Sequence, residues 1–280
     1  MTPDELIPIE EFEYCYKKNR VSANGDIYQE RCKNTVRVDS VPSRTGIMIC
    51  GIGSVIGSTI ASSIMASQDS IRWRDKNGLH HHDLSEMLTK SMYIEVGVDD
   101  AGSPVEKSPC DIAPLCDTSN LVIGGWDTNN SSLSRAIEEA RVVPIDIQNK
   151  LRYRTRSFKP MRGIYNQHYS PGDIDPNLLN IVPVELSLKE QLNVVISDIA
   201  RFKDENKVET VCILSANEER DVMIEDIHHD FHVLMRYINN WGTSHARGCM
   251  VSPSQLLQVA CILTDCHFVD LSDSSVLLPC

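Results

Sequence analysis

The sequence has no apolar run approaching the roughly 20 residues that a membrane-spanning helix requires. Its first residues, Met1–Glu5, also lack the basic and apolar regions of a signal peptide. Positive charge is scarce, because 27 Lys and Arg residues are set against 39 Asp and Glu residues, and the formal net charge is −12. Such a chain is repelled by nucleic-acid phosphates and anionic lipid surfaces. We therefore expect a cytoplasmic protein with no nucleic-acid or membrane partner and a small-molecule role.

The short motifs of several protein classes are missing as well. None of the ten cysteines belongs to a C-x-x-C pair, and those inside apolar runs (Cys50, Cys212 and Cys261) are interpreted as reduced thiols that pack as small hydrophobes. The sequence has no G-x-S-x-G pentad and no glycine turn that ends in Gly-Lys-Ser/Thr. These absences disfavour a disulfide scaffold, an α/β-type hydrolase and an ATPase.

Two groups of histidines raise the question of a metal site. His80–His82 precede Asp83, while His228 and His232 are four residues apart, a spacing that places two side chains on one face of a helix. Neither group has a third ligand at an ordered spacing, as a structural or catalytic zinc site requires. We therefore expect these histidines to bind no metal.

What is present favours a globular protein of one large or two modest domains, since 280 residues with 41% hydrophobic composition can bury a sizeable core. The first 45 residues are polar and contain Asn24-Gly25, a hairpin signal between partly alternating segments, which predicts an antiparallel ribbon. The residues from Pro160 to Pro176 are rich in Pro, Gly, Asn and Asp and are interpreted as a loop.

Beyond residue 45, short apolar runs alternate with helical patterns. The predicted strands are Ile47–Cys50, Met92–Val98, Leu121–Gly124, Val211–Leu214 and His267–Val269. The predicted helices include Ser131–Ala140, Gln255–Leu263 and an amphipathic helix between Leu186 and Lys207. Such alternation is typical of an α/β fold with a doubly wound, mainly parallel sheet.

The segment from Gly46 to Ser67 predicts a strand, a glycine turn and a helix. Its glycines Gly51, Gly53 and Gly57 would permit a tight turn, the approach of a pyrophosphate, and close packing of helix on strand. The helix N-terminus would then point its N–H groups at the phosphates. The spacing G-x-G-x-x-x-G is one residue longer than the usual fingerprint, so a glycine turn without a ligand stays an alternative.

Four further stretches indicate a family. They are Leu121–Asp127, which ends in Gly-Trp-Asp, Val142–Leu151 with Asp146-Ile147-Gln148, Ser215–Arg220, and Ser252–Gln255 at the start of a helical pattern. Together with the glycine turn, they resemble the N-terminal part of the inositol-3-phosphate synthases, collinearly from about Glu11 to the last residue. The resemblance implies a Rossmann-like domain over residues 46–280, preceded by a ribbon segment over residues 1–45. It also implies that the doubly wound sheet is incomplete, because family members continue beyond this point.

The resemblance further implies a set of cofactor contacts. The family's G-G-N-N turn matches Gly53, Ser54, Val55 and Ile56. Val55 and Ile56 replace the two asparagines, so their side-chain hydrogen bonds are lost and only backbone donors remain. Asp127 matches the aspartate of the family's G-W-D, although a helix N-cap is an alternative role for it, one for which residues 128–130 are better placed. The full set of implied NAD contacts is Gly51, Gly53, Ser54, Val55, Ile56, Gly57, Asp127, Gly163, Ile164, Ser215, Ala216, Asn217 and Ser272.

The family converts glucose 6-phosphate to inositol 3-phosphate with bound NAD, for inositol and phospholipid-precursor synthesis. Glu218 puts a carboxylate where the family has threonine, close to the expected pyrophosphate, and like charges there weaken binding. The family's lysines that bind the substrate phosphate and stabilise the enolate have no matching positions in this sequence. Two hypotheses stay open: a synthase homologue with that activity, or a non-catalytic, truncated paralogue that acts as a nucleotide-binding or subunit-interaction module, as a homo-oligomer or with a partner subunit.

Overall fold

The structure, a computed structural model, describes residues 11–22, 24–37, 42–81, 87–99, 101–112, 115–170, 180–220, 222–242, 248–271 and 278–279. By its internal contacts the chain divides into two units, residues 1–42 with 84–116 and residues 43–83 with 117–280. The first change of unit falls near the boundary expected at residue 45, whereas residues 84–116 group with the first unit. None of the described helices is long and apolar enough to cross a membrane.

The second unit contains a five-stranded sheet in which all neighbouring strands are parallel. In spatial order the strands are β11 (His267–Asp270), β10 (Thr210–Ser215), β3 (Thr45–Cys50), β8 (Leu121–Asp127) and β9 (Met161–Arg162). The chain runs from the central strand β3 to β8 on one side and later to β10 on the other, so the sheet is doubly wound. The predicted α/β class is confirmed.

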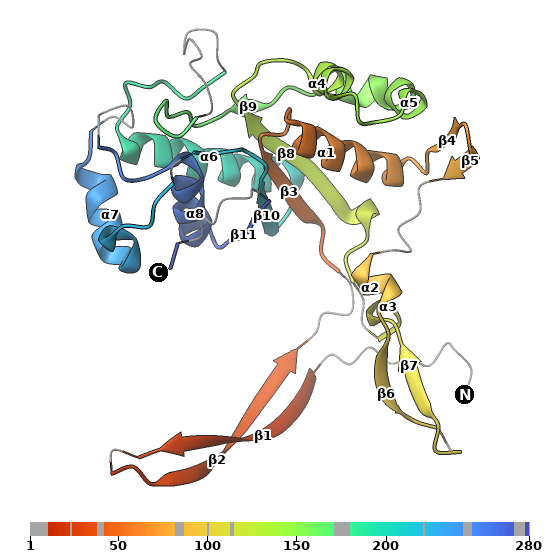
Figure 1. Ribbon diagram of the computed structural model, residues 1–280, viewed down its shortest axis with the longest axis vertical. Helices are drawn as coiled ribbons and strands as arrows, with labels where there is room; N and C mark the ends of the chain where they lie inside the picture. The colour runs from red at the N-terminus through yellow and green to blue at the C-terminus, as the bar shows by residue number, and fades with distance from the viewer. Residues whose placement is uncertain are drawn as a thin grey trace. The chain divides into compact units, whose positions relative to one another are not determined.

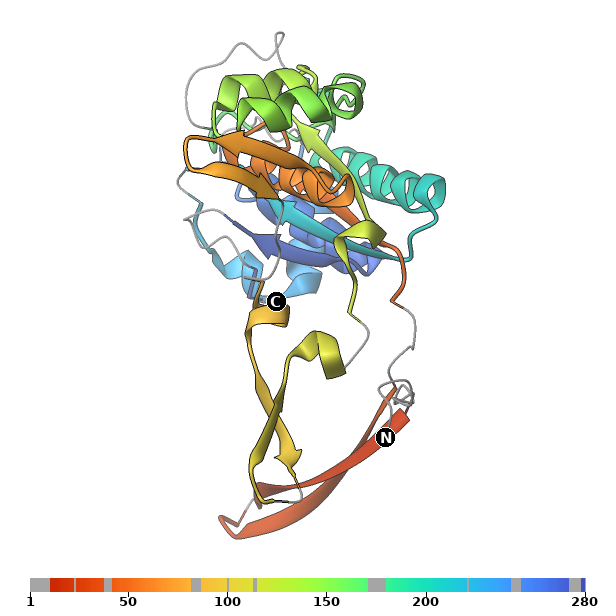
Figure 2. The ribbon, with the colours of Figure 1, turned by 90° about the vertical axis from the view of Figure 1, so that its right-hand side faces the viewer.

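Six helices cover the two faces of this sheet (Figures 1 and 2). On one face lie α1 (Val55–Gln68), α4 (Leu133–Ala140) and α5 (Ile145–Thr155). On the other face lie α6 (Leu188–Asn206), α7 (Phe231–Asn240) and α8 (Pro253–Thr264). The short 3-10 helices η2 (Thr118–Asn120) and η4 (Asp226–His229) precede β8 and α7.

The alternation of side chains along β3 divides the core into two layers. Met48 and Cys50 belong to the cluster under α6, α7 and α8, while Ile49 between them belongs to the cluster under α1, α4 and α5. Successive strand residues point to opposite faces, so a strand covered on both sides reads as a continuous apolar run. This explains why Ile47–Cys50 could be recognised as a strand from composition alone.

Helix α6 shows how local sequence and packing agree. It begins with a capping box in which the Ser187 hydroxyl accepts the N–H of Glu190 and the Glu190 carboxylate accepts the N–H of Ser187. Near its C-terminal end, the ring of Phe202 packs against Gly46 and Gly124, where a Cβ atom at either glycine would lie 2.6 Å from the ring. The amphipathic helix predicted between residues 186 and 207 is confirmed.

The remaining strands form two-stranded antiparallel ribbons. The first unit contains the ribbon of β1 (Glu11–Val21) with β2 (Ile27–Arg37), the ribbon of β6 (Ile94–Val98) with β7 (Pro104–Lys107), and the short helices α2 (Leu88–Ser91) and α3 (Pro109–Ile112). The second unit contains the ribbon of β4 (Arg72–Asp75) with β5 (Gly78–His81). The N-terminal ribbon is confirmed, and Gly25 in its turn has a positive φ of 87°.

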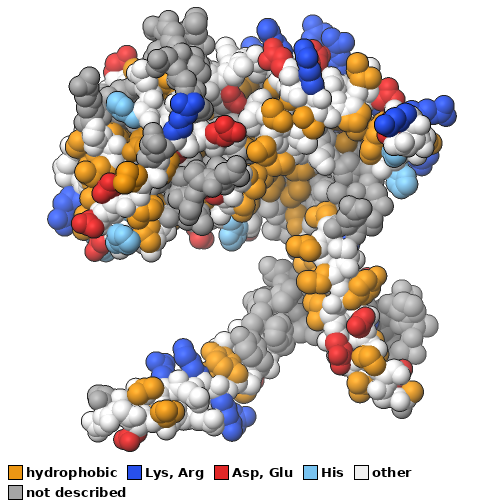
Figure 3. Space-filling view, viewed as in Figure 1, with side chains coloured by type: hydrophobic (Ala, Val, Ile, Leu, Met, Phe, Trp, Pro, Cys, Tyr) orange, Lys and Arg blue, Asp and Glu red, His pale blue; other side chains and the backbone are white. Residues whose placement is uncertain are grey.

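Two element predictions are wrong. Met92–Val98 does not join the parallel sheet but pairs in antiparallel register with β7, and Ile94, Val96 and Val98 are 43%, 47% and 66% exposed. Figure 3 shows the apolar side chains on this ribbon and on α2. A short, mostly apolar run fits a buried strand and an exposed ribbon equally well, because its covering by other elements is a tertiary property. The predicted loop from Pro160 to Pro176 also contains the short edge strand β9.

Candidate dinucleotide site

The glycine turn lies where β3 ends. This is the topological switch point of the sheet, since the chain passes from β3 to β8 on one side and β10 lies on the other. Gly51 has a φ of 79°, a conformation that L-residues with a side chain rarely adopt. A Cβ atom on Gly57 would collide with the carbonyl oxygen of Gly51, so a glycine is needed there for the first turn of α1 to pack on the strand end. Ligands of doubly wound sheets bind in the crevice outside the carboxyl ends of the strands at this point.

The first donors of the turn bind to the protein itself. The N–H groups of Gly51 and Ile52 donate to the carbonyl of Trp126 at 2.8 and 3.2 Å, and the N–H of Gly53 donates to Oδ2 of Asp127 at 2.6 Å. Both acceptors lie at the end of β8. The turn is therefore held against the neighbouring strand by hydrogen bonds within the protein.

The next donors are divided between the helix cap and open space. Ser54 is the N-cap of α1, where its hydroxyl accepts the N–H of Gly57 at 3.0 Å and donates to the carbonyl of Ala216 at 3.3 Å. Among the described residues, the N–H groups of Val55 and Ile56 at the first two helical positions have no protein acceptor. Two adjacent open donors at a helix N-terminus are suited to bind an anionic phosphate.

Asp127 is almost fully buried, with 8% of its surface exposed. Its Oδ2 accepts the N–H of Gly53, and its Oδ1 accepts the N–H of Asn129 at 2.7 Å. Burial raises the pKa of Asp127 above its usual value, although the two N–H donors act in the opposite direction. Ser132 caps α4 through the N–H of Arg135, so the alternative of Asp127 as an N-cap is wrong, as is the placement of that cap at residues 128–130.

The loop after β9 closes against the same strand end. The N–H of Gly163 donates to the carbonyl of Asp127 at 3.3 Å, and a Cβ atom at this glycine would lie 3.1 Å from the backbone N of Thr128. Ile164 is buried and lines a cavity of about 180 Å³ outside the strand ends. Thr128, Ser170, Asn217 and Glu219 line this cavity too. The structure thus brings Gly163 and Ile164 close to Asp127.

The end of β10 completes the cradle from the other side. The N–H of Ala216 donates to the carbonyl of Cys50 at 2.9 Å, and the side-chain amide of Asn217 donates to the Cys50 sulfur at 3.1 Å. Ser215 is buried, with its hydroxyl 3.3 Å from that of Ser254. The structure thus brings the glycine turn next to Asp127 and residues 215–217. Ser272 lies outside the described residues.

Sequence reasoning missed Glu219 in this cluster. Its Oε1 accepts both the N–H and the hydroxyl of Ser254 at 2.8 Å, at the N-terminus of α8. Its Oε2 is buried and has no hydrogen-bond partner among the described residues, and burial raises the pKa of this carboxylate. An acidic residue shortly after a strand, facing the Ser-Pro-Ser start of a helix, is the signal that points to it, because helix N-termini favour carboxylates.

The histidines do not form a metal site in the part of the chain that the structure describes, which contains no cluster of three or more candidate ligands. The prediction that His228 and His232 share one helix face is wrong, since His228 lies in η4 and His232 lies in α7 beyond the N-cap Asp230. His228 is instead buried, with Nδ1 accepting the N–H of Glu225 at 2.8 Å and Nε2 lying 3.1 Å from the carbonyl of Met250.

Comparison with known proteins agrees with this geometry. The family model of myo-inositol-1-phosphate synthase, an NAD-binding domain, matches residues 45–280. An inositol-3-phosphate synthase from Candida glabrata is 31% identical over 284 residues, which cover 95% of this chain and 52% of the relative. The Dictyostelium discoideum enzyme of the same name is 26% identical over 272 residues, with coverage of 95% and 52%.

A solved structure matches as well. The crystal structure of inositol-3-phosphate synthase from Caenorhabditis elegans superimposes with a TM-score of 0.81 at 28% identity, and the match covers 96% of this chain and 52% of that one. The chain thus spans about half the length of the relatives that it matches.

Proposed function

The chain belongs to the inositol-3-phosphate synthase (myo-inositol-1-phosphate synthase) family, and we propose that its glycine turn binds the pyrophosphate of NAD. The observation that carries this proposal is the pair of open N–H donors of Val55 and Ile56, which lie at the N-terminus of α1 beside a turn that is already fixed by Asp127. A phosphate at this position gains both donors and the favourable end of the helix dipole.

The residues present fit such a group. Gly51 and Gly57 add no side chains where the turn meets the first turn of α1, and the carboxyl ends of β3, β8 and β10 supply the walls of the crevice. We assign the NAD-binding domain to residues 46–280 and the ribbon segment to residues 1–45. The proposed contacts are Gly51, Gly53, Ser54, Val55, Ile56, Gly57, Asp127, Gly163, Ile164, Ser215, Ala216, Asn217 and Ser272. NAD, when bound, supplies a hydride acceptor.

A proline at the first helical position tests the donor directly. Val55→Pro removes one of the two open N–H groups, while proline is well tolerated at this position and the ψ of 168° at Ser54 suits a residue that precedes proline. The matched control Val55→Ala shortens the side chain but keeps the N–H. In calorimetric titration with NAD, we expect affinity roughly tenfold weaker for Val55→Pro, the loss of one charge-assisted hydrogen bond, and nearly unchanged for Val55→Ala.

Two results would overturn this proposal. One is the absence of saturable NAD binding to the unmodified chain. The other is equal affinity of Val55→Pro and Val55→Ala for NAD, since the phosphate would then not use this donor. Circular dichroism of both variants shows whether α1 and the rest of the fold are retained.

The family's cyclisation of glucose 6-phosphate to inositol 3-phosphate is a separate question. We propose that this chain alone binds NAD but does not cyclise the sugar phosphate, and that it acts as a nucleotide-binding or subunit-interaction module, in a homo-oligomer or with a partner subunit, in the cytoplasm. Val55 and Ile56 depart from the family's G-G-N-N turn, and Glu218 stands where the family has threonine. These departures support this view. Incubation with NAD and glucose 6-phosphate tests it, and formation of inositol phosphate would favour the synthase hypothesis.

A further inference from the structure

A second cavity lies within the same unit but at the opposite ends of the strands, where β3 and β8 begin. It encloses about 690 Å³ and is lined by the start of β8, the C-terminal ends of α1 and α5, and Arg44 just before β3. This volume is within the range of small-molecule sites. None of the residues proposed to contact NAD lines it, so the two sites are independent.

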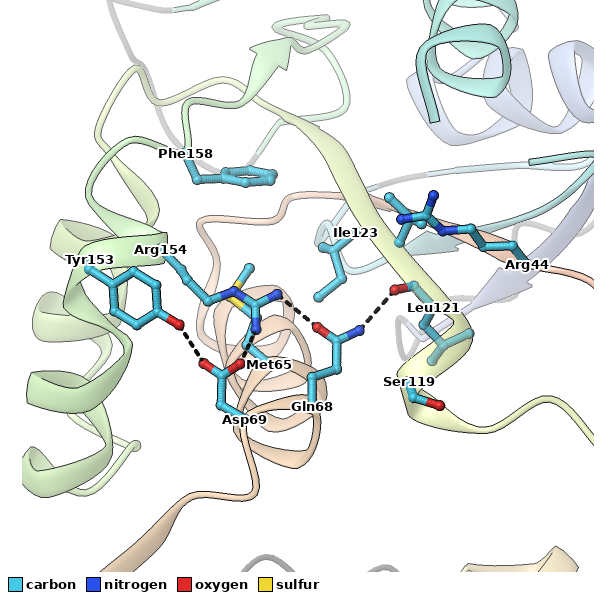
Figure 4. Close-up of a pocket in the computed structure, with 11 residues that line it drawn as sticks. Arg44, Met65, Gln68, Asp69, Ser119, Leu121, Ile123, Tyr153, Arg154 and Phe158 are labelled. Atoms are coloured by element: carbon cyan, nitrogen blue, oxygen red, sulfur yellow. Dashed lines mark hydrogen bonds and ion pairs between the residues drawn. The ribbon is translucent and has the colours of Figure 1, made fainter. Parts of the chain in front are cut away.

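One wall of this cavity is a set of polar groups that hold one another in place. The guanidinium of Arg154 donates to Oδ1 of Asp69 at 2.8 Å and to Oε1 of Gln68 at 2.7 Å (Figure 4). The hydroxyl of Tyr153 donates to Oδ2 of Asp69 at 3.1 Å, and the amide of Gln68 donates to the carbonyl of Leu121 at 2.8 Å. Side chains of α1 and α5 are thus linked to each other and to the start of β8, which makes the wall preorganised.

A second part of the lining is apolar. Met65 of α1, Ile123 of β8 and Phe158 after α5 contribute to it, and Ile123 and Phe158 are only partly buried (Figure 4). Small-molecule pockets typically combine such apolar walls with a few placed polar groups. A flat apolar body would therefore gain contact here by removing these side chains from water.

Arg44 gives the cavity its charge. Its Nη1 donates to the carbonyl of Asn206 at 3.2 Å, and no carboxylate of a described residue lies within ion-pair distance of it. Arg154, by contrast, is already paired with Asp69. The lining therefore carries one unbalanced positive charge in a chain whose formal net charge is −12. A guanidinium has five donors, so Arg44 retains several for an anionic ligand.

We propose that this cavity is a binding site for an organic anion with a flat apolar body and a single carboxylate, in which Met65, Ile123 and Phe158 contact the body and Arg44 binds the carboxylate. The site is separate from the dinucleotide crevice, at the other end of the same strands. The proposal does not depend on whether NAD binds.

The test uses 2-naphthoate as the probe and neutral 2-naphthamide as its matched comparison, each titrated calorimetrically into the full chain. We expect one molecule of 2-naphthoate per chain and affinity at least about tenfold tighter than for the amide, as a charge-assisted hydrogen bond would give. Arg44→Gln should remove this difference. Arg152→Gln, an exposed arginine of α5 that does not line the cavity, is the matched control and should preserve it.

A second variant keeps the test valid if Arg44→Gln folds poorly. Ser119 is an exposed residue of the rim, and Ser119→Trp places a large side chain in the cavity without disturbing the core, so it should abolish binding of both probes. Saturating NAD should leave 2-naphthoate binding unchanged. Equal affinity for acid and amide, displacement by NAD, or undiminished binding to Ser119→Trp would each overturn the proposal.

Discussion

Asp127 shows how a buried carboxylate can order a glycine turn that is distant in sequence. It accepts the N–H of Gly53 at 2.6 Å and thereby fixes the turn that presents the open donors of Val55 and Ile56. The family resemblance predicts Asp127 as a cofactor contact but gives no hint of this bond, because the two residues are 74 positions apart. The oxygens of Asp127 have further lone pairs that can accept hydrogen bonds. The contact of Asp127 with nucleotide hydroxyls stays a prediction.

Glu218 provides a prediction about charge at the same site. It is exposed, lines the small cavity beside the strand ends, and follows Asn217, whose side chain contacts the end of β3. Glu218→Gln keeps the size of the side chain and removes a negative charge near the proposed pyrophosphate. We expect NAD affinity to rise roughly two- to fivefold, the range of exposed charge interactions, measured by calorimetry at low ionic strength.

Glu209→Gln is the matched control, because Glu209 is an exposed residue just before β10, at the opposite end of that strand. It changes the net charge equally but should leave NAD affinity unchanged. The gain from Glu218→Gln should also shrink with added salt, since screening weakens exposed charge pairs. Equal gains from both variants would show that only net charge matters and would contradict a local effect.

His228 gives a prediction about pH. Its buried ring accepts an N–H at Nδ1, so Nε2 carries the proton and donates to the Met250 carbonyl, and a second proton has no acceptor. Burial lowers the pKa of His228 below 6.5. The unfolded chain therefore binds more protons, and the free energy of unfolding should decrease as the pH falls below 6.5 toward the folded-state pKa.

Urea unfolding at pH 7.5, 6.5 and 5.5 measures this dependence. His228→Gln, which offers one acceptor and one donor but does not titrate, should show a smaller decrease than the unmodified chain. His229→Gln is the control, because this neighbour is exposed, and its pH dependence should match that of the unmodified chain. The same slope in all three proteins would rule out His228 as a source of acid sensitivity.

At the scale of elements, predictions succeeded where local pattern and burial agree. The strand, turn and helix from Gly46 to Ser67 could be predicted because a continuous apolar run meets a glycine turn and a helical pattern. The contacts between elements could not be predicted in the same way. The packing of Phe202 on Gly46 and Gly124 joins three segments distant in sequence, and no local pattern specifies such a contact.

The candidate site shows the same contrast between what the sequence predicts and what depends on contacts between elements. The resemblance predicts which segments approach the nucleotide, and the structure brings Asp127 and residues 215–217 to the glycine turn. Which N–H groups of the turn bond to the protein and which stay open depends on atomic distances, so it could not be predicted. The buried Oε2 of Glu219, which has no hydrogen-bond partner among the described residues, could not be predicted either, because its burial results from the packing of α8 over the strand ends.

The N-cap of α6 gives a prediction for one element. Ser187 caps α6, one of the three helices on one face of the sheet, so Ser187→Ala should lower the free energy of unfolding by about 1 kcal/mol. Ser197→Ala is the control within the same helix, since the hydroxyl of this exposed residue only bonds back to the carbonyl of Asn193. Urea unfolding compares the two, and equal losses would mean that the cap contributes nothing beyond removal of a serine.

At the scale of the whole molecule, the second unit is discontinuous in sequence. Residues 43–83 supply β3 and α1, and residues 117–280 supply every other strand of the parallel sheet. All described residues that are proposed to contact NAD, and both cavities described above, belong to this unit. Residues 84–116 therefore interrupt a unit whose described core and proposed sites contain none of them, although they fall within the NAD-binding domain proposed above, residues 46–280.

This arrangement predicts that residues 84–116 can be replaced. A Gly/Ser linker of about 12 residues, with a mean span of about 20 Å, should leave cooperative urea unfolding and NAD affinity close to those of the full chain. The same linker in place of residues 133–157 should abolish both, because α4 and α5 contribute the buried side chains of Leu133, Ile137, Ile147 and Leu151 to the core. Loss of the fold in both deletions would show that residues 84–116 stabilise the second unit, and the two units would then have to be treated as one cooperative structure.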